Sequence, residues 1–215
     1  MVSLSRKMKK TSPCLWLSED ILIAITKSVK NLAANKDAPA VKLKCLMSTM
    51  NISREEELYP YVIEWLRKFL KGRHRNSAVE AYDTHKINLS KFLQNNKLQN
   101  CFPEFSAFDI KVDITGIIKS KKSVKLAFVE CKTDPITLKD VGQILGYSKV
   151  ANPDYSFIIS PSGLSSPLSV LLQTFGRYDL LEYGSRKIRI AEWNLDRMEI
   201  DSNTILPPGE HFLYY

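Results

Sequence analysis

The sequence predicts an α/β fold, a central mixed β-sheet flanked by helices, with a helical N-terminal extension. From residue 53 onwards the main patterns follow the order helix, strand, strand, strand, helix, strand, helix, strand, as in a layered α/β domain. Of the 215 residues, 44% are hydrophobic and 25% are charged, which is typical of a globular chain. We therefore expect an extension over residues 1–50 and one domain over residues 51–215.

The extension is basic and has a helical pattern. Ser18 is a candidate N-cap for a helix over 18–34, and 40–50 is a candidate second helix. Nine Lys and Arg residues stand against three acids in the first 50 positions, an excess of +6 in a chain of net charge +8. A concentrated positive end favours a polyanionic partner, with nucleic acid first. The extension is a candidate for DNA contact or dimerisation.

Composition also bears on the location of the protein. No window of about 20 apolar residues occurs, so we expect no membrane span, and acidic residues interrupt the apolar start, unlike a secretory signal. The cysteines, Cys14, Cys45, Cys101 and Cys131, are far apart in sequence, which does not fit zinc or iron–sulfur spacing. A reducing, cytoplasmic location is therefore expected.

The domain begins with the clearest helical pattern, over residues 53–72. Ser53 and Glu56 match an S-x-x-E capping box, a signature of helix starts, and an apolar stripe follows at helical spacing. Residues 76–84 then read as a strand, and 88–96 as a short helix.

A hairpin is predicted next. Over 108–118, apolar side chains alternate with polar ones, which indicates a strand with one buried face. The charged segment KSKKS at 119–123 is the turn, and 124–132 is the returning strand.

After the hairpin, helical and strand patterns alternate. Leu138, Val141 and Leu145 are spaced to point inward from one helix. The predicted elements are a helix at 136–151, a strand at 155–161, a helix at 166–178 and a strand at 187–195.

The hairpin brings two acids and a lysine towards one point. Glu130 and Lys132 are two positions apart and share a strand face, and Asp113 precedes Glu130 by 17 positions, a separation that a hairpin closes. Two carboxylates beside an ammonium suit a hard divalent cation, Mg²⁺ or Mn²⁺ in its place, and a water nucleophile. The backbone carbonyl of Cys131 is a further candidate ligand. Lys132 would orient the water, help to deprotonate it, or stabilise the transition-state charge.

The stretch VDITGII…KLAFVECKTD…LKDVGQILGYSKVA…YSFIISP resembles the PD-(D/E)XK nuclease superfamily over roughly half of the chain. Asp113 matches the first acid of that motif, Glu130 the second acid and Lys132 the lysine. The resemblance implies a restriction-endonuclease-like fold and Mg²⁺-dependent hydrolysis of DNA phosphodiester bonds. Val112 replaces the proline of the family name, and Asp109, on the same predicted face as Asp113, is an alternative metal ligand.

Two further features support the resemblance. Gln143 and Tyr147, four apart on one helix face, are similar to the Q-x-x-x-Y signature of RecB-type exonucleases. Many family members also bring a Glu from the first helix to the metal. Of the three acids in REEELYP, we choose Glu55 as this catalytic and metal-binding acid, because it shares the inward stripe, and Glu80 is the alternative.

Basic residues outside the trio are candidate phosphate contacts. The predicted DNA-binding residues are Arg73, Arg75, Lys119, Lys121, Lys122 and Tyr147. The expected function is a DNA endonuclease of the restriction type, or one that cuts Holliday junctions or other DNA structures. Because one site cuts one strand, we expect a homodimer. The alternatives are a RecB-like exonuclease and a non-catalytic nucleic-acid-binding protein that retains the fold.

Overall fold

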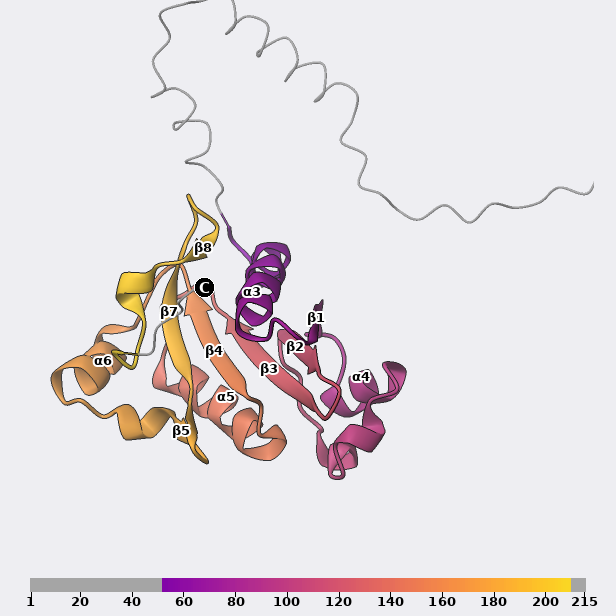
Figure 1. Cartoon of the computed structure of the whole chain (residues 1–215). Helices are drawn as coiled ribbons and strands as arrows, with labels where there is room; N and C mark the ends of the chain where they lie inside the picture. Colours follow the sequence, from indigo (N-terminus) through magenta and orange to yellow (C-terminus); the bar gives the residue numbers. More distant parts are fainter. Residues whose placement is uncertain (1–51, 210–215) are drawn as a thin grey trace, which may run out of the picture. The chain divides into compact units, whose positions relative to one another are not determined.

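The computed structural model describes residues 52–209. The chain divides into two units, Met1–Thr49 and Met50–Tyr215, and the helices predicted at 18–34 and 40–50 lie outside the described residues. The described part confirms the α/β class, because a curled mixed sheet lies between helices (Figure 1). No helix in this part has the length and apolar character that crossing a membrane requires.

The domain begins with a 3₁₀ turn, η1 (Glu55–Glu57), which leads into α3 (Tyr59–Arg73). Pro60 lies in the first turn of α3, where its missing N–H leaves no bond unmade. The predicted capping box is wrong, because the regular helix starts only at Tyr59. The Ser53 N–H donates to the carboxylate of Glu57 at 3.0 Å, rather than to Glu56.

Within the described residues, the main sheet has six strands in the order β1-β2-β3-β4-β7-β8. The strands are β1 (Ala78–Asp83), β2 (Ile114–Lys119), β3 (Val124–Cys131), β4 (Tyr155–Ser160), β7 (Arg189–Asn194) and β8 (Glu199–Ile200). Strands β1, β2 and β3 pair antiparallel, β3, β4 and β7 pair parallel, and β8 is antiparallel to β7. The predicted mixed sheet is thus confirmed.

Shorter elements complete the domain. They are α4 (Leu89–Asn95), η2 (Gln99–Cys101), η3 (Phe105–Ala107), α5 (Leu138–Ala151), α6 (Ser166–Ser169), the π-helical turn η4 (Val170–Thr174), η5 (Tyr178–Leu181), β5 (Glu182–Tyr183), β6 (Arg186–Lys187) and η6 (Ser202–Thr204). Strands β5 and β6 form a separate antiparallel ribbon. The start of α5 is fixed by a capping box, in which Thr137 and Asp140 bond each other's backbone, a device that satisfies N–H groups left open by the helix.

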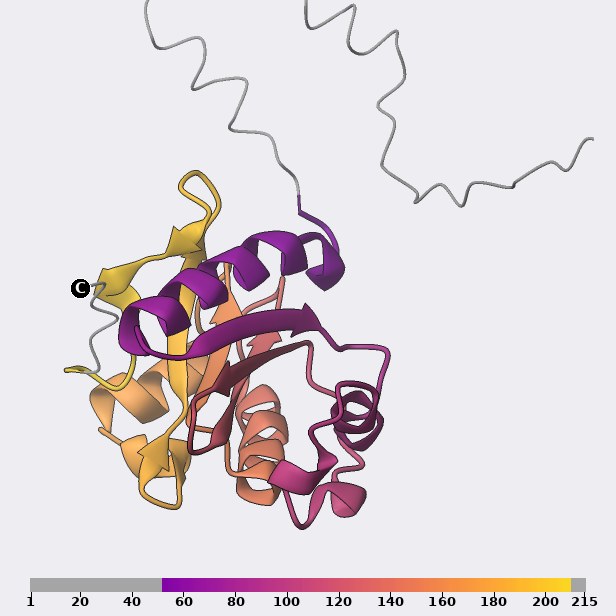
Figure 2. The same cartoon turned by 45° about the vertical axis from the view of Figure 1, so that its right-hand side comes forward.

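Helices cover both faces of the sheet, as the turned view shows (Figure 2). The domain has two hydrophobic cores, one on each face of the sheet, and alternate residues of β3 pack into them. Ala127 and Val129 pack into the core that includes α3, whereas Leu126 and Phe128 pack into the core that includes α5. Both faces of this strand are buried, which explains why its sequence is a continuous apolar run rather than an alternating one.

Two sequence expectations about this region are wrong. The strand predicted over 108–118 begins only at Ile114. The residues before it are irregular, and their carbonyls bind the start of α4, since Leu89 N–H donates to Ile110 O and Ser90 N–H to Phe108 O. Leu138 was expected to point inward but is 53% exposed, because the buried stripe of α5 begins after it.

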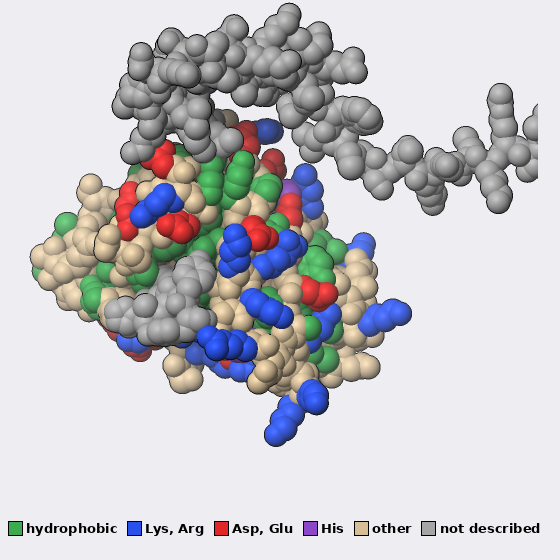
Figure 3. Space-filling view, turned by 45° about the horizontal axis from the view of Figure 1, so that its top comes forward, with side chains coloured by type: hydrophobic (Ala, Val, Ile, Leu, Met, Phe, Trp, Pro, Cys, Tyr) green, Lys and Arg blue, Asp and Glu red, His purple; other side chains and the backbone are tan. Residues whose placement is uncertain are grey.

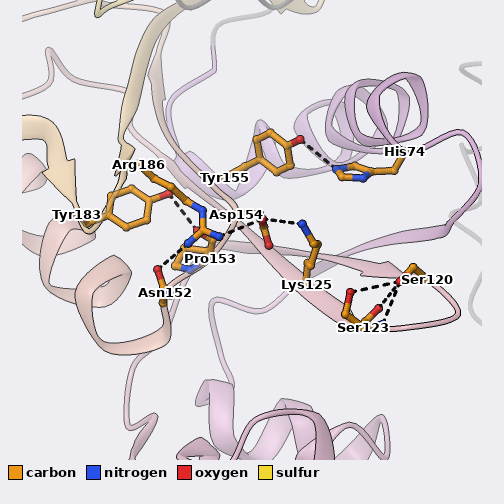
Figure 4. A network of polar contacts seen from close by, with 10 residues as sticks. All are labelled: His74, Ser120, Ser123, Lys125, Asn152, Pro153, Asp154, Tyr155, Tyr183 and Arg186. Atoms are coloured by element: carbon orange, nitrogen blue, oxygen red, sulfur yellow. Dashed lines mark hydrogen bonds and ion pairs between the residues drawn. The ribbon is translucent and has the colours of Figure 1, made fainter.

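A polar network fixes the entry of β4 at the edge opposite the carboxyl ends of β3 and β4 (Figure 4). The Asp154 carboxylate lies 2.9 Å from the Lys125 ammonium of β3 and 3.2 Å from the Arg186 guanidinium of β6. Arg186 also donates to Asn152, which ends α5 in the left-handed conformation. The network therefore links the helix–strand turn before β4 to β3 of the main sheet and to β6 of the separate ribbon.

Candidate active site

Asp113 lies in the loop before β2, next to the carboxyl end of β3. Ile114 pairs with Val129 across β2 and β3, so Asp113 lies beside the end of β3. Buried Thr84 fixes this loop, because its N–H donates to Asp113 O at 2.8 Å and its hydroxyl to Val112 O at 2.6 Å. These two hydrogen bonds hold the backbone carbonyls of Val112 and Asp113 in place.

Both carboxylate oxygens of Asp113 accept hydrogen bonds. Oδ1 accepts from the Tyr59 hydroxyl and Oδ2 from the Cys131 N–H, each at 2.9 Å. The backbone of Cys131 therefore contributes to the site through its amide, while the role predicted for its carbonyl stays a prediction.

Lys132 lies beside two of the predicted acids, Glu130 and Glu55. Lys132 Nζ lies 3.1 Å from Glu130 Oε1 and 3.3 Å from Glu55 Oε1. Glu55 comes from η1, more than 70 positions earlier in the chain. The choice of Glu55 among three adjacent acids thus agrees with its position in the structure.

The helix α5 adds the glutamine. Gln143 Nε2 donates to Glu130 Oε1 at 2.7 Å, and Tyr147 follows four positions later on the same helix. Oε1 of Glu130 thus serves two donors. Its Oε2 is buried and has no hydrogen-bond partner among the described residues, which leaves an acceptor atom open in a buried position.

Burial and like charges control ionisation here. Burial, reinforced by the charge of Asp113, raises the pKa of Glu130 to about 7, and burial also raises the pKa of Asp113 and of Glu55. Burial alone would lower the pKa of Lys132, but Glu130 and Glu55 raise it above its usual value. The lysine is therefore a cation at neutral pH, beside three carboxyl groups whose ionisation is disfavoured by burial.

A divalent cation beside these acids would favour their ionised form. Among residues 52–209, no three His, Cys, Asp or Glu side chains gather closely enough to hold a metal ion by themselves. Mg²⁺, however, often takes only one or two protein carboxylates and completes its shell with water and substrate phosphate. The open Oε2 of Glu130 and the neighbouring carboxylate of Asp113 fit that donor set.

The two alternative acids, Glu80 and Asp109, have partners outside the candidate site. Glu80 lies on β1 and pairs with Lys119 at 2.7 Å, and Asp109 accepts a hydrogen bond from Asn88. Neither is hydrogen-bonded to the trio. Lys119, a predicted phosphate contact, is therefore already engaged by an acid.

A cleft of about 490 Å³ opens beside Asp113 and includes residues that the sequence did not single out. Tyr59 and His85 line it, with ring centroids 5.2 Å apart. The His85 ring is hydrogen-bonded through Nδ1 to Asp83. Tyr59 lies four positions after Glu55 on the buried stripe, so helical spacing could have indicated it. For His85, a single histidine in a loop, the sequence carries no such signal.

The remaining predicted DNA contacts are dispersed over the surface. Lys121 and Lys122 lie exposed in the turn between β2 and β3, Arg75 lines a groove with Arg67, Lys68 and Lys71, and the Arg73 guanidinium lies 5.7 Å from the Phe69 ring centroid. Figure 3 shows Lys and Arg side chains across much of one face.

We compared the chain with protein-family models, curated proteins and solved structures, and none of the three comparisons gave a match.

Proposed function

We propose that the protein is a metal-dependent nuclease that hydrolyses DNA phosphodiester bonds at the cleft beside Asp113. The observation that carries this proposal is the convergence of Asp113, Glu130 and Lys132 at the end of β3, with Glu130 Oε2 buried and open. This is the trio that resembles the PD-(D/E)XK signature, and the resemblance extends the proposal to a restriction-endonuclease-like fold.

Asp113 and Glu130 would hold Mg²⁺, or Mn²⁺ in its place, with Glu55 and the Cys131 carbonyl as further candidate ligands. The bound ion would polarise the scissile phosphate and promote ionisation of a water. Tyr59 and the Cys131 amide orient Asp113, and Gln143 orients Glu130.

Lys132 has a narrower role than the sequence suggested. Its raised pKa disfavours loss of the ammonium proton. Of the three roles left open by the sequence, stabilising the negative charge of the transition state and orienting the water fit a permanent cation, whereas accepting the proton of that water does not.

An endonuclease is the primary form of the proposal, and one site per chain then favours a homodimer for cutting both strands of DNA. The bond from Gln143 to Glu130 favours a second candidate, a RecB-like exonuclease, because the Q-x-x-x-Y pair lies at the trio. A non-catalytic DNA-binding protein is the third candidate.

One experiment separates these functions. The full chain and its Asp113→Ala variant are incubated with supercoiled plasmid, linear duplex and a four-way junction, in Mg²⁺, Mn²⁺ or EDTA. Nicked or linearised plasmid, or a resolved junction, identifies an endonuclease, and loss from linear ends identifies an exonuclease. DNA binding without metal-dependent cutting would refute catalysis. Cutting that survives Asp113→Ala would place the metal elsewhere.

A further inference from the structure

A second, polar pocket lies at the carboxyl ends of β4 and β7. Its volume is about 390 Å³. Its polar lining includes Gln173, Glu192 and Asn203, and its apolar wall includes Ile136 and Ile190. In α/β sheets, ligands bind outside the carboxyl ends of parallel strands, so this pocket occupies the edge at which a ligand is expected.

The pocket shares that edge with the candidate active site. Glu130, Ile158 and Ile190 pair across β3, β4 and β7. Two residues further on, side chains return to the same face, so Lys132 and Glu192 occupy one row, two strands apart. At about 4.8 Å per strand, the two backbone positions are about 10 Å apart.

Hydrogen bonds also join the loops that leave β3 and β4. The Ser162 hydroxyl donates to Thr133 O at 2.6 Å, and Ile136 N–H donates to Gly163 O at 2.8 Å. Gly163 has φ +65°, and a Cβ at this position would lie 3.5 Å from the carboxyl carbon of Glu192. The glycine thus lets the chain that follows β4 turn tightly against the Glu192 carboxyl group.

The polar groups of the pocket have a defined pattern of free donors and acceptors. In the part of the chain that the structure describes, the Glu192 carboxylate makes no hydrogen bond or ion pair. Gln173 accepts from the Ser169 hydroxyl through Oε1 at 2.9 Å, which leaves its NH₂ group to donate. The Thr204 hydroxyl is already used, because it donates to Asp201 O at 2.9 Å. The lining of the pocket therefore includes a carboxylate that can accept and amide groups that can donate.

This pattern is complementary to one nucleobase edge. A carboxylate only accepts, and it accepts from two adjacent donors at once. On their Watson–Crick edges, adenine and cytosine place an acceptor next to their amino group, and thymine has one N–H between two carbonyls. Guanine has N1–H and N2–H₂ side by side, followed by the O6 acceptor. Of the four bases, guanine alone offers two adjacent donors to the two oxygens of a carboxylate and an acceptor beside them for an amide NH₂.

We propose that this pocket is a subsite for an unpaired guanine near the scissile phosphate, with Glu192 as the residue that selects it. The inference deepens the proposed function and rests on it, because it assumes a nucleic-acid substrate. Glu192 accepts from N1–H and N2–H₂, Gln173 or Asn203 donates to O6, and the aliphatic wall packs on the ring. Unpaired bases are read in this way through their Watson–Crick edges.

The test measures binding without catalysis. Fluorescein-labelled oligothymidylates that carry a single guanine or a single adenine are titrated with the full chain in EDTA, and fluorescence anisotropy is recorded. We expect the guanine strand to bind about ten-fold more tightly, the value of one good bidentate pair. Glu192→Gln should remove this preference without changing the affinity for the adenine strand. Glu199→Gln on β8 is the matched control and should retain the preference, and thermal unfolding checks that both variants are folded.

Equal affinity for the two strands, or a preference that survives Glu192→Gln, would overturn the proposal. Free arginine, whose guanidinium also presents two adjacent donors, is titrated in parallel. Glu192-dependent competition by arginine without a guanine preference would reassign the pocket to an arginine side chain. The two proposals fail in different assays. If the nuclease proposal is wrong, no substrate is cut in Mg²⁺, whether or not the binding assay in EDTA shows a guanine preference.

Discussion

Replacing Glu130 with glutamine is expected to stabilise the metal-free protein at alkaline pH. Glu130 is 2% exposed, and its pKa rises from 4.5 to about 7 on folding. Folding therefore favours the protonated carboxyl group. As pH rises above 4.5, the free energy of unfolding falls, because Glu130 would ionise in the unfolded chain, and the loss is complete above pH 7. The glutamine side chain has the shape of the protonated acid and does not ionise.

The size of the effect follows from the two pKa values. One pKa unit corresponds to about 1.4 kcal/mol, so the full cost of ionising Glu130 is about 3 kcal/mol. The cost is about 1 kcal/mol at pH 5 and nearly complete at pH 8, a difference of about 2.5 kcal/mol. This difference already includes the ion pair with Lys132, because the attraction of the ammonium lowers the pKa of Glu130 from the value that burial alone would set. We therefore expect an increase of about 2.5 kcal/mol in the advantage of the variant between pH 5 and pH 8.

Urea unfolding in EDTA, followed by circular dichroism at both pH values, measures this change. Glu80→Gln is a control of opposite sign, because the hydrogen bond from Lys119 lowers the pKa of Glu80. That variant should be less stable than the unmodified chain at both pH 5 and pH 8, with little change between them, because Glu80 becomes protonated only below pH 4.5. If Glu130→Gln shows the same stability difference from wild type at pH 5 and pH 8, the assigned cost of burying Glu130 is wrong.

Two other predictions concern the scaffold. Gly116→Ala should destabilise the fold by about 1–3 kcal/mol, because the new Cβ would lie 2.8 Å from Leu70 Cδ1 and 3.2 Å from Ala127 Cβ; unchanged urea unfolding would mean that α3 shifts without cost. Thr137→Ala should cost about 1 kcal/mol through loss of the α5 capping box with Asp140, measured by thermal unfolding. Thr137→Ser, which keeps the hydroxyl, should cost less, and equal losses would exclude capping as the cause.

The sequence predicted best where burial dictates the pattern. Strands β3 and β4 are buried on both faces and read as continuous apolar runs, so their bounds were close to those observed. Glu130 interrupts the apolar run of β3, and this contrast marks it as a candidate functional residue. The pairing of Glu130 with Lys132 follows from their spacing of two along an extended chain.

The sequence predicted poorly where distant segments meet. The residues before Ile114 alternate like a strand, but they bind α4 instead of a neighbouring strand, and periodicity does not reveal the partner. Tyr59 and Asp113 are 54 positions apart, so their hydrogen bond has no local signature. Glu192 is placed in a pocket by the parallel pairing of β4 with β7, a register that the sequence does not specify.

The most direct test of the central claim is the rate of DNA cutting by a Lys132→Met variant in Mg²⁺. Single-turnover cleavage of the preferred substrate is measured for the full chain, for Lys132→Met and for Lys149→Met, an exposed lysine on α5. Removing a cation that stabilises the transition state should slow cutting by about 100-fold or more, while DNA affinity in EDTA and the rate of the Lys149→Met control stay near those of the unmodified chain. Cutting by Lys132→Met at the unmodified rate would contradict the assignment of this cleft as a nuclease site.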